Sequence, residues 1–110
     1  MATIKEDFVS FETAKLLKEK NCPDFGYSCI CDSEGNKAQT QSIIMKWLRE
    51  VHGLFISIGC DDLNWNWQVF DIKHRDENLD PICKSESYGG LDSYEEACER
   101  AIKYCLEDLI

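Results

Sequence analysis

The chain has 110 residues, 44% of them hydrophobic and 30% charged, and its 21 acidic and 12 basic side chains give a formal net charge of −9 at pH 7. Because a chain of this length forms one domain with a core of its own, we expect a single domain over residues 1–110. The negative charge repels phosphate backbones and anionic lipid head groups, so we expect neither nucleic acid nor a membrane surface as a partner.

Seven cysteines stand at positions 22, 29, 31, 60, 83, 98 and 105, an odd number that cannot pair off completely. The first residues contain no apolar stretch of the kind that forms a secretory signal. No apolar run approaches the roughly 18 residues that a membrane helix requires. We therefore expect a cytoplasmic protein whose thiols are reduced and mostly buried as small hydrophobic side chains.

The first third of the chain predicts a helix followed by a hairpin. Ser10 can cap a helix over 11–20 by accepting a hydrogen bond from the first turn. Strands at 27–31 and 37–40 then flank a polar loop, in which Gly35 can adopt the positive φ that a hairpin turn needs.

The helix predicted over 41–52 has the clearest pattern in the chain. Thr40 can cap its start, and Gly53 stands where a helix-ending glycine belongs. Its apolar residues recur at the spacing of one helix face: Ile44, Trp47, Leu48 and Val51.

Alternation with period two takes over in the second half. It predicts a strand over 54–60 and, after a turn at 61–64, a return strand over 65–72. In the return strand the apolar positions change face between Val69 and Phe70, which predicts a bulge or burial on both faces.

A polar loop at 74–80 leads to a short strand near 82–86, which the Gly89-Gly90 pair is expected to end. The last helix begins at a capping box formed by Ser93 and Glu96. Its predicted buried stripe consists of Cys98, Ala101, Ile102, Cys105 and Leu109.

These elements predict an α+β fold in the order α-β-β-α-β-β-β-α, with the helices packed on one face of a small, mainly antiparallel sheet. The part from 41 to 108 has the element order of a double-stranded-RNA-binding domain. That likeness is one of order alone, and the acidity argues against the corresponding function.

Three cysteines form the candidate metal site. Cys29 and Cys31 alternate onto one face of a predicted strand and Cys22 lies on a nearby loop, so their sulfurs could converge on zinc. A fourth ligand would come from His52, Cys60, His74 or Cys83. The paired spacing typical of zinc sites is absent, so buried thiols are the favoured interpretation and we predict no metal or other cofactor.

Catalytic motifs are absent from the sequence. It has no glycine-rich phosphate loop and no Gly-x-Ser-x-Gly, and no spacing places a cysteine beside a histidine as a thiol enzyme requires. We therefore predict no catalytic residue.

Two features are candidates for binding a partner. Trp65 and Trp67 share one strand face, where they either contact a partner or pack in the core. The segment 91–110, which includes Glu95 and Glu99, holds six acidic and two basic residues, so it offers an acidic surface or an imitation of nucleic acid.

Three stretches of the chain resemble a family of short uncharacterised proteins of gut anaerobes and their phages or integrated elements. They are VSFETAKLLKEK at 9–20, MKWLREVH at 45–52 and the ending from YEEA at 94–97 to IKYCL at 102–106. The resemblance implies an intracellular accessory protein of mobile-element origin and brings no established activity with it.

Our functional hypothesis is a non-enzymatic interaction or accessory module that binds a host or phage protein. The alternatives are a small zinc or thiol enzyme and an acidic mimic of nucleic acid that inhibits a host defence protein. The sequence leaves the oligomeric state open.

Overall fold

A computed structural model describes residues 7–26, 29–60, 64–75, 77–78 and 80–110. It confirms the α+β class and the predicted order of elements. In chain order these are α1 (Phe11–Glu19), β1 (Cys29–Cys31), β2 (Lys37–Gln39), α2 (Gln41–His52), β3 (Leu54–Cys60), β4 (Trp65–Arg75), β5 (Pro81–Leu91), α3 (Tyr94–Tyr104) and the π-helical turn η1 (Cys105–Leu109).

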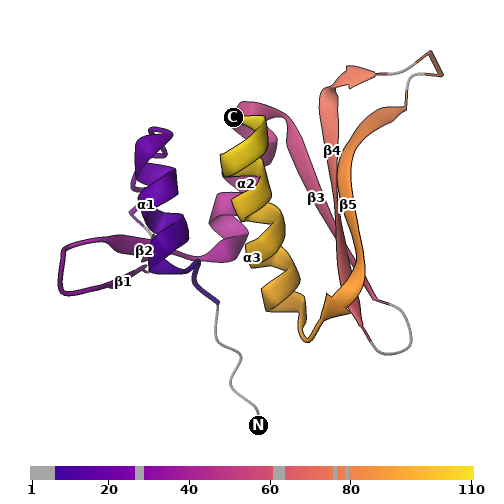
Figure 1. Cartoon of the computed structure of the whole chain (residues 1–110). Coiled ribbons are helices and arrows are strands. Elements are labelled where there is room, and N and C mark those ends of the chain that lie inside the picture. Colours follow the sequence, from indigo (N-terminus) through magenta and orange to yellow (C-terminus); the bar gives the residue numbers. More distant parts are fainter. Residues whose placement is uncertain (1–6, 27–28, 61–63, 76, 79) are drawn as a thin grey trace, which may run out of the picture.

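The strands form two antiparallel sheets, a hairpin of β1 and β2 and a three-stranded sheet in the order β3-β4-β5. In Figure 1 the helices lie on one side of the three-stranded sheet, and α1 lies beside the hairpin at the far side of α3. Within the described residues no helix covers the other face of that sheet (Figure 1).

Side-chain caps begin all three α-helices where the sequence predicts them. Ser10 Oγ accepts from the Thr13 amide at 3.1 Å, and Thr40 Oγ1 accepts from the Ile43 amide at 3.4 Å. Ser93 Oγ accepts from the amide of Glu96 at 3.1 Å. These bonds satisfy amide groups that the first turn of a helix leaves without a partner.

The reciprocal half of the α3 capping box differs slightly from the standard pattern, because Glu96 Oε2 accepts from the amide of Asp92, at 3.1 Å, one residue before the cap. At the end of α2, Gly53 takes φ 66°, and its amide bonds the Leu48 carbonyl. A left-handed residue of this kind is the common way for a helix to end.

The residues before α1 are tied to the hairpin by backbone pairing. Val9 N–H donates to the Gln39 carbonyl at 3.0 Å, and Phe8 forms an isolated antiparallel bridge with Thr40. This pairing positions α1 against β2 and buries Val9 in the core.

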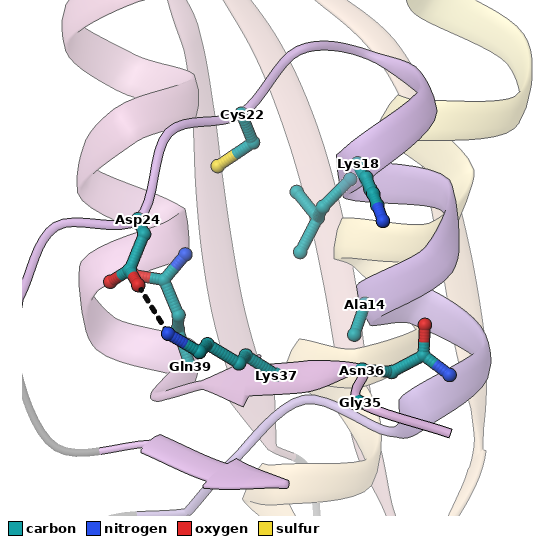
Figure 2. Close-up of a pocket in the computed structure, with 9 residues that line it drawn as sticks. Ala14, Lys18, Cys22, Asp24, Gly35, Asn36, Lys37 and Gln39 are labelled. Atoms are coloured by element: carbon teal, nitrogen blue, oxygen red, sulfur yellow. Dashed lines mark hydrogen bonds and ion pairs between the residues drawn. The ribbon is translucent and has the colours of Figure 1, made fainter. Parts of the chain in front are cut away.

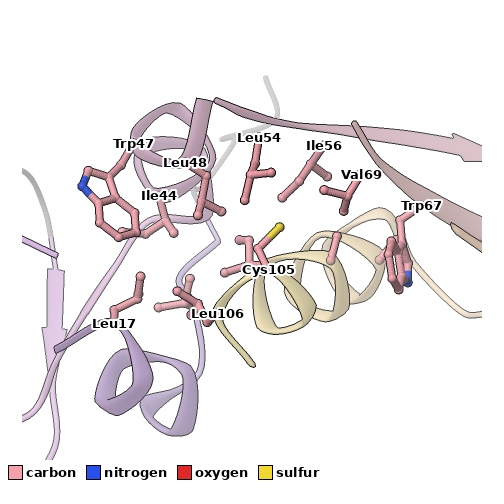
Figure 3. Packing of buried hydrophobic residues seen from close by; sticks show 14 of the residues in the cluster. Leu17, Ile44, Trp47, Leu48, Leu54, Ile56, Trp67, Val69, Cys105 and Leu106 are labelled. Carbon is pink, nitrogen blue, oxygen red and sulfur yellow. The ribbon is translucent and has the colours of Figure 1, made fainter. Parts of the chain in front are cut away.

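The hydrophobic core lies between the three helices and the inner face of the larger sheet (Figure 3). It is built from residues that the helix and strand periods place on facing surfaces. Its fully or almost fully buried members include Leu17, Ala38, Ile44, Leu48, Leu54, Ile56, Val69, Ala97, Ala101, Ile102, Cys105 and Leu106.

The later strands are longer than predicted. β4 continues to Arg75, and β5 runs through Gly89-Gly90 to Leu91, so the prediction that these glycines end the strand is wrong. The predicted bulge is confirmed by a shift in the β4–β5 register between Val69 and Phe70. The predicted turn at 61–64 falls largely outside the described residues.

The last helix changes from α-helical to π-helical geometry after Tyr104. Residues Cys105–Leu109 form a π-helical turn in which Ile110 N–H donates to the Cys105 carbonyl at 3.1 Å. Leu106, which was not in the predicted stripe, is fully buried, whereas the predicted Leu109 is only partly buried.

Among the described residues, no helix combines the length and the apolar character that a membrane crossing requires.

Candidate functional site

A hollow of about 220 Å³ opens between α1, the segment after it and the hairpin (Figure 2). Its wall combines apolar, charged and amide side chains. The lining residues are Ala14, Leu17, Lys18, Cys22, Asp24, Gly35, Asn36, Lys37 and Gln39.

The charges of the hollow are partly neutralised. Lys37 Nζ lies 3.1 Å from Asp24 Oδ2 (Figure 2), and this contact raises the pKa of the lysine. The pKa of Asp24 is lowered, first by the Gly26 amide that donates to its other oxygen at 2.9 Å and then by Lys37. Lys18, on the rim, forms no ion pair with a described residue, so the lining carries one more positive than negative charge.

Gln39 holds the wall of the hollow in place. Its Oε1 accepts from the Phe25 amide at 3.1 Å, and its Nε2 donates to the Pro23 carbonyl at 3.0 Å. A buried amide with both ends bonded fixes the segment after α1 against β2. These two hydrogen bonds therefore fix the wall of the hollow that the segment after α1 forms.

The Cys22 thiol faces this hollow, whose described lining contains no histidine. Its Sγ lies 3.6 Å from the Pro23 carbonyl, and burial raises its pKa to about 11. At neutral pH such a thiol stays protonated, and the protonated form is a poor nucleophile and a poor metal ligand.

The three cysteines of the candidate zinc site lie on two segments, Cys22 in the stretch after α1 and the other two in β1. In the described part of the chain, no three His, Cys, Asp or Glu side chains are arranged to hold a metal ion. Cys29 and Cys31 lie in β1 opposite Gln39 and Lys37. Of the seven cysteines, Cys98 and Cys105 are buried, whereas Cys22 and Cys29 are half-buried and the other three are exposed, so the prediction that the thiols are mostly buried is wrong.

The two histidines proposed as partners of the cysteines have other contacts. The ring of His52 packs edge-on against Trp47 with centroids 4.6 Å apart, and burial lowers its pKa. His74 Nδ1 lies 2.8 Å from Asp71 Oδ2. Neither arrangement is that of a thiol enzyme, in which histidine bonds the nucleophile.

Trp65 and Trp67 face α3. The ring of Trp67 lies 5.4 Å from that of Tyr104 and its side chain is buried, while half-buried Trp65 meets Tyr94 edge-on at 5.8 Å. The packing interpretation of this strand face therefore accounts for both indoles.

Glu95 and Glu99, the two acidic residues of α3 that were candidates for partner binding, differ in burial and in their contacts. Glu95 is exposed, but Glu99 turns toward α1, where its Oε1 accepts from Thr13 Oγ1 at 2.6 Å and from the Ser10 amide at 3.1 Å. Its other oxygen is buried without a hydrogen-bond partner among the described residues. Glu99 thus joins the first and last helices.

We expect Thr13→Val to destabilise the protein by about 1–3 kcal/mol, because it removes the hydroxyl that donates to the half-buried Glu99 carboxylate and leaves a side chain of similar shape. Thr13 is fully buried, so water cannot replace the lost donor. Chemical denaturation of the variant measures the change. Ser33→Ala provides the control, since it removes a hydroxyl from an exposed position of the hairpin loop, and an equal effect of the two changes would contradict the role of the Glu99 bond.

The feature that sequence analysis did not single out is the side of β3 that faces away from β4, which we call the β3 edge. β3 is the end strand of its sheet, and its pairing with β4 has no register shift from Leu54 to Cys60. Ile72 N–H donates to the Gly53 carbonyl at 2.9 Å, which makes that pair a hydrogen-bonded one.

Hydrogen-bonded and non-hydrogen-bonded pairs alternate along two antiparallel strands. This first bond therefore fixes which backbone groups of β3 point toward β4 and which point away from it. The backbone amide and carbonyl groups of Phe55, Ser57 and Gly59 form hydrogen bonds with β4. The amide and carbonyl groups of the intervening residues point outward along the β3 edge: Leu54, Ile56, Ile58 and Cys60. The signal available in the sequence was the absence of any charged residue or proline from 54 to 60.

No protein-family model, no curated protein and no solved structure matches this chain.

Proposed function

We propose that the protein is a non-enzymatic protein-interaction module and that the β3 edge is the surface through which it binds. The observation that carries this proposal is an unprotected edge strand. Proteins normally protect such edges with charged residues, proline or bulges, because the unpaired amide and carbonyl groups can accept another strand. β3 has none of the three in its seven residues.

The side chains next to the edge favour contact with protein. On the outer face of the sheet Phe55 is 41% exposed, and the neighbouring Ser57 and Gly59 are small and uncharged. An added strand would obtain backbone hydrogen bonds from the edge and an apolar contact from the phenyl ring. We prefer this function to a zinc enzyme because, among the described residues, no three His, Cys, Asp or Glu side chains are arranged to hold a metal ion.

An intracellular setting and an origin in a phage or other mobile element belong to the same proposal. They are supported by the sequence resemblance described above. The partner in this setting would be a host or phage protein that offers an extended segment.

The test is a comparison of proteins captured from the lysate of the producing cell by the wild-type chain and by two variants. Ser57→Lys adds a charge beside the β3 edge, whereas Gln68→Lys adds the same charge to the same sheet face on the central strand. We expect Ser57→Lys to lower recovery of a specific partner about tenfold, equivalent to 1.4 kcal/mol. Gln68→Lys should retain it. Equal recovery with both variants would contradict binding at the β3 edge.

A further inference from the structure

We infer that the strand received by the β3 edge is β3 of a second copy of this chain, so that two copies form one continuous six-stranded sheet. The inference rests on the proposed function and concerns the same surface, for which a second copy of the chain and a segment of a host or phage protein would compete. It follows from the directions of the backbone groups, the side chains on the outer face and the distribution of charge.

An antiparallel pair of identical strands is self-complementary about a two-fold axis. In β3 that axis falls at Ser57, the central residue of the strand. Ile56 then lies opposite Ile58 of the second copy, and Leu54 lies opposite Cys60. These are the residues whose amide and carbonyl groups point outward, so each pair can exchange two backbone hydrogen bonds along the full strand.

The same register matches the side chains on the outer face. Phe55 lies opposite Gly59 of the second copy, at a position where the pairing brings side chains closest. Gly59 has no side chain that could clash with the ring, and the side chain of Asn66 already lies over the Cβ position of that glycine. The exposed ring of Phe55 would thus be partly covered in both copies.

Charge favours this approach over other ways in which two copies could meet. The chain carries a net charge of −9, yet residues 54–60 carry none, so the edges can meet without placing acidic groups in contact. The remaining repulsion is long-range and is screened by salt. Raising ionic strength from about 0.01 M to 0.1 M shortens the Debye length from about 30 Å to 10 Å. The dimer should therefore strengthen as salt is added.

A sheet-edge contact buries less surface than most permanent interfaces, so we expect a reversible dimer. Sedimentation equilibrium of the full chain under reducing conditions should show a monomer–dimer equilibrium that shifts toward the dimer with concentration and salt. Ser57→Lys should weaken dimerisation about tenfold or more, because it places two like charges directly opposite each other. Gln68→Lys should weaken it much less.

Cysteine crosslinking tests the register itself. Directly opposed residues in a pair without hydrogen bonds have Cα atoms about 4.5 Å apart, within disulfide reach. Under mild oxidation Ser57→Cys should therefore give a link between the two introduced thiols, identified by mass spectrometry of the peptides. Ser33→Cys, in the exposed hairpin loop, is the matched control and should not link at a comparable rate.

A wild-type chain that stays monomeric at every concentration and salt level would overturn this inference. So would a dimer that Ser57→Lys leaves intact, or linking of the Ser33→Cys variant at the same rate as the Ser57→Cys variant. If the chain is monomeric but Ser57→Lys still abolishes capture of another protein, the second copy is excluded while the proposed function stands. If the dimer forms with the link at position 57 and no other protein is captured, the inference stands and binding of a foreign partner is excluded.

Discussion

Replacing Leu106 by alanine should lower the free energy of unfolding by about 2–5 kcal/mol, the usual cost of removing most of a fully buried leucine side chain. Leu106 has no exposed surface, and Figure 3 shows it between α1 and α2, facing Leu17. Removing it therefore leaves a cavity at the meeting point of the three helices. Urea titration followed by circular dichroism measures the loss.

The matched control for this change is Leu109→Ala, three residues further along the same π-helical turn. Leu109 is only partly buried, so its truncation should cost much less than that of Leu106. A larger effect at Leu109 would mean that the last turn continues the regular α-helical stripe and that the π-helical turn is absent.

Trp67→Ala should also be strongly destabilising, by about 3–5 kcal/mol. The side chain of Trp67 is 9% exposed, projects from β4 beside α3 (Figure 3) and packs against Tyr104. Its loss removes a large aromatic surface from the contact between β4 and α3, and thermal or urea unfolding would report it.

The unfolding free energy of Trp65→Ala, compared with that of Trp67→Ala, distinguishes a packing role of the two tryptophans from a role in binding a partner. Trp65 is half-buried, meets Tyr94 edge-on and packs against the border of the core, so the free energy of unfolding of the variant should be closer to that of the wild type. If both tryptophans could be replaced with little loss of stability, their packing role would be wrong and a partner surface would again be the better explanation.

The helices and their limits were largely predictable because their signals are local. Ser10, Thr40 and Ser93 each cap a helix with a side chain that reaches an amide three residues on. The hairpin loop and the bulge near Val69 are local as well, since they depend on a glycine at positive φ and on a change of apolar face.

The parts that escaped prediction depend on residues distant in the sequence. Gly89 and Gly90 are poor strand formers, yet β5 continues past them to Leu91. They lie where the β4–β5 register shifts, between the Trp67–Ser87 and Trp65–Leu91 pairs, so a bulge accommodates them without ending the strand. Glu99 has the pattern of a surface acid on a helix, but its partners Ser10 and Thr13 are almost ninety residues away. The π-helical turn carries no distinctive sequence signal, so the expected stripe included Leu109 and left out Leu106.

The candidate site was predicted less well than the fold. A zinc site needs several side chains to converge at fixed distances, and the spacing of Cys22, Cys29 and Cys31 could not show whether they do. The β3 edge had a visible signal in its lack of charge, but only the strand order reveals that β3 lies at the end of a sheet.

The two outer strands of the larger sheet differ in a way that limits how far it can grow. β5 begins at a proline, carries the exposed Lys84 and pairs with β4 through several register shifts, features that discourage addition of a strand. β3 lacks all of them. A sheet that can be extended from one side only reaches a finite assembly after a single addition, whereas a sheet open on both sides can polymerise into a fibre. In the proposed dimer the irregular β5 would thus stop the addition of further copies, so that an unprotected β3 would not lead to unlimited aggregation.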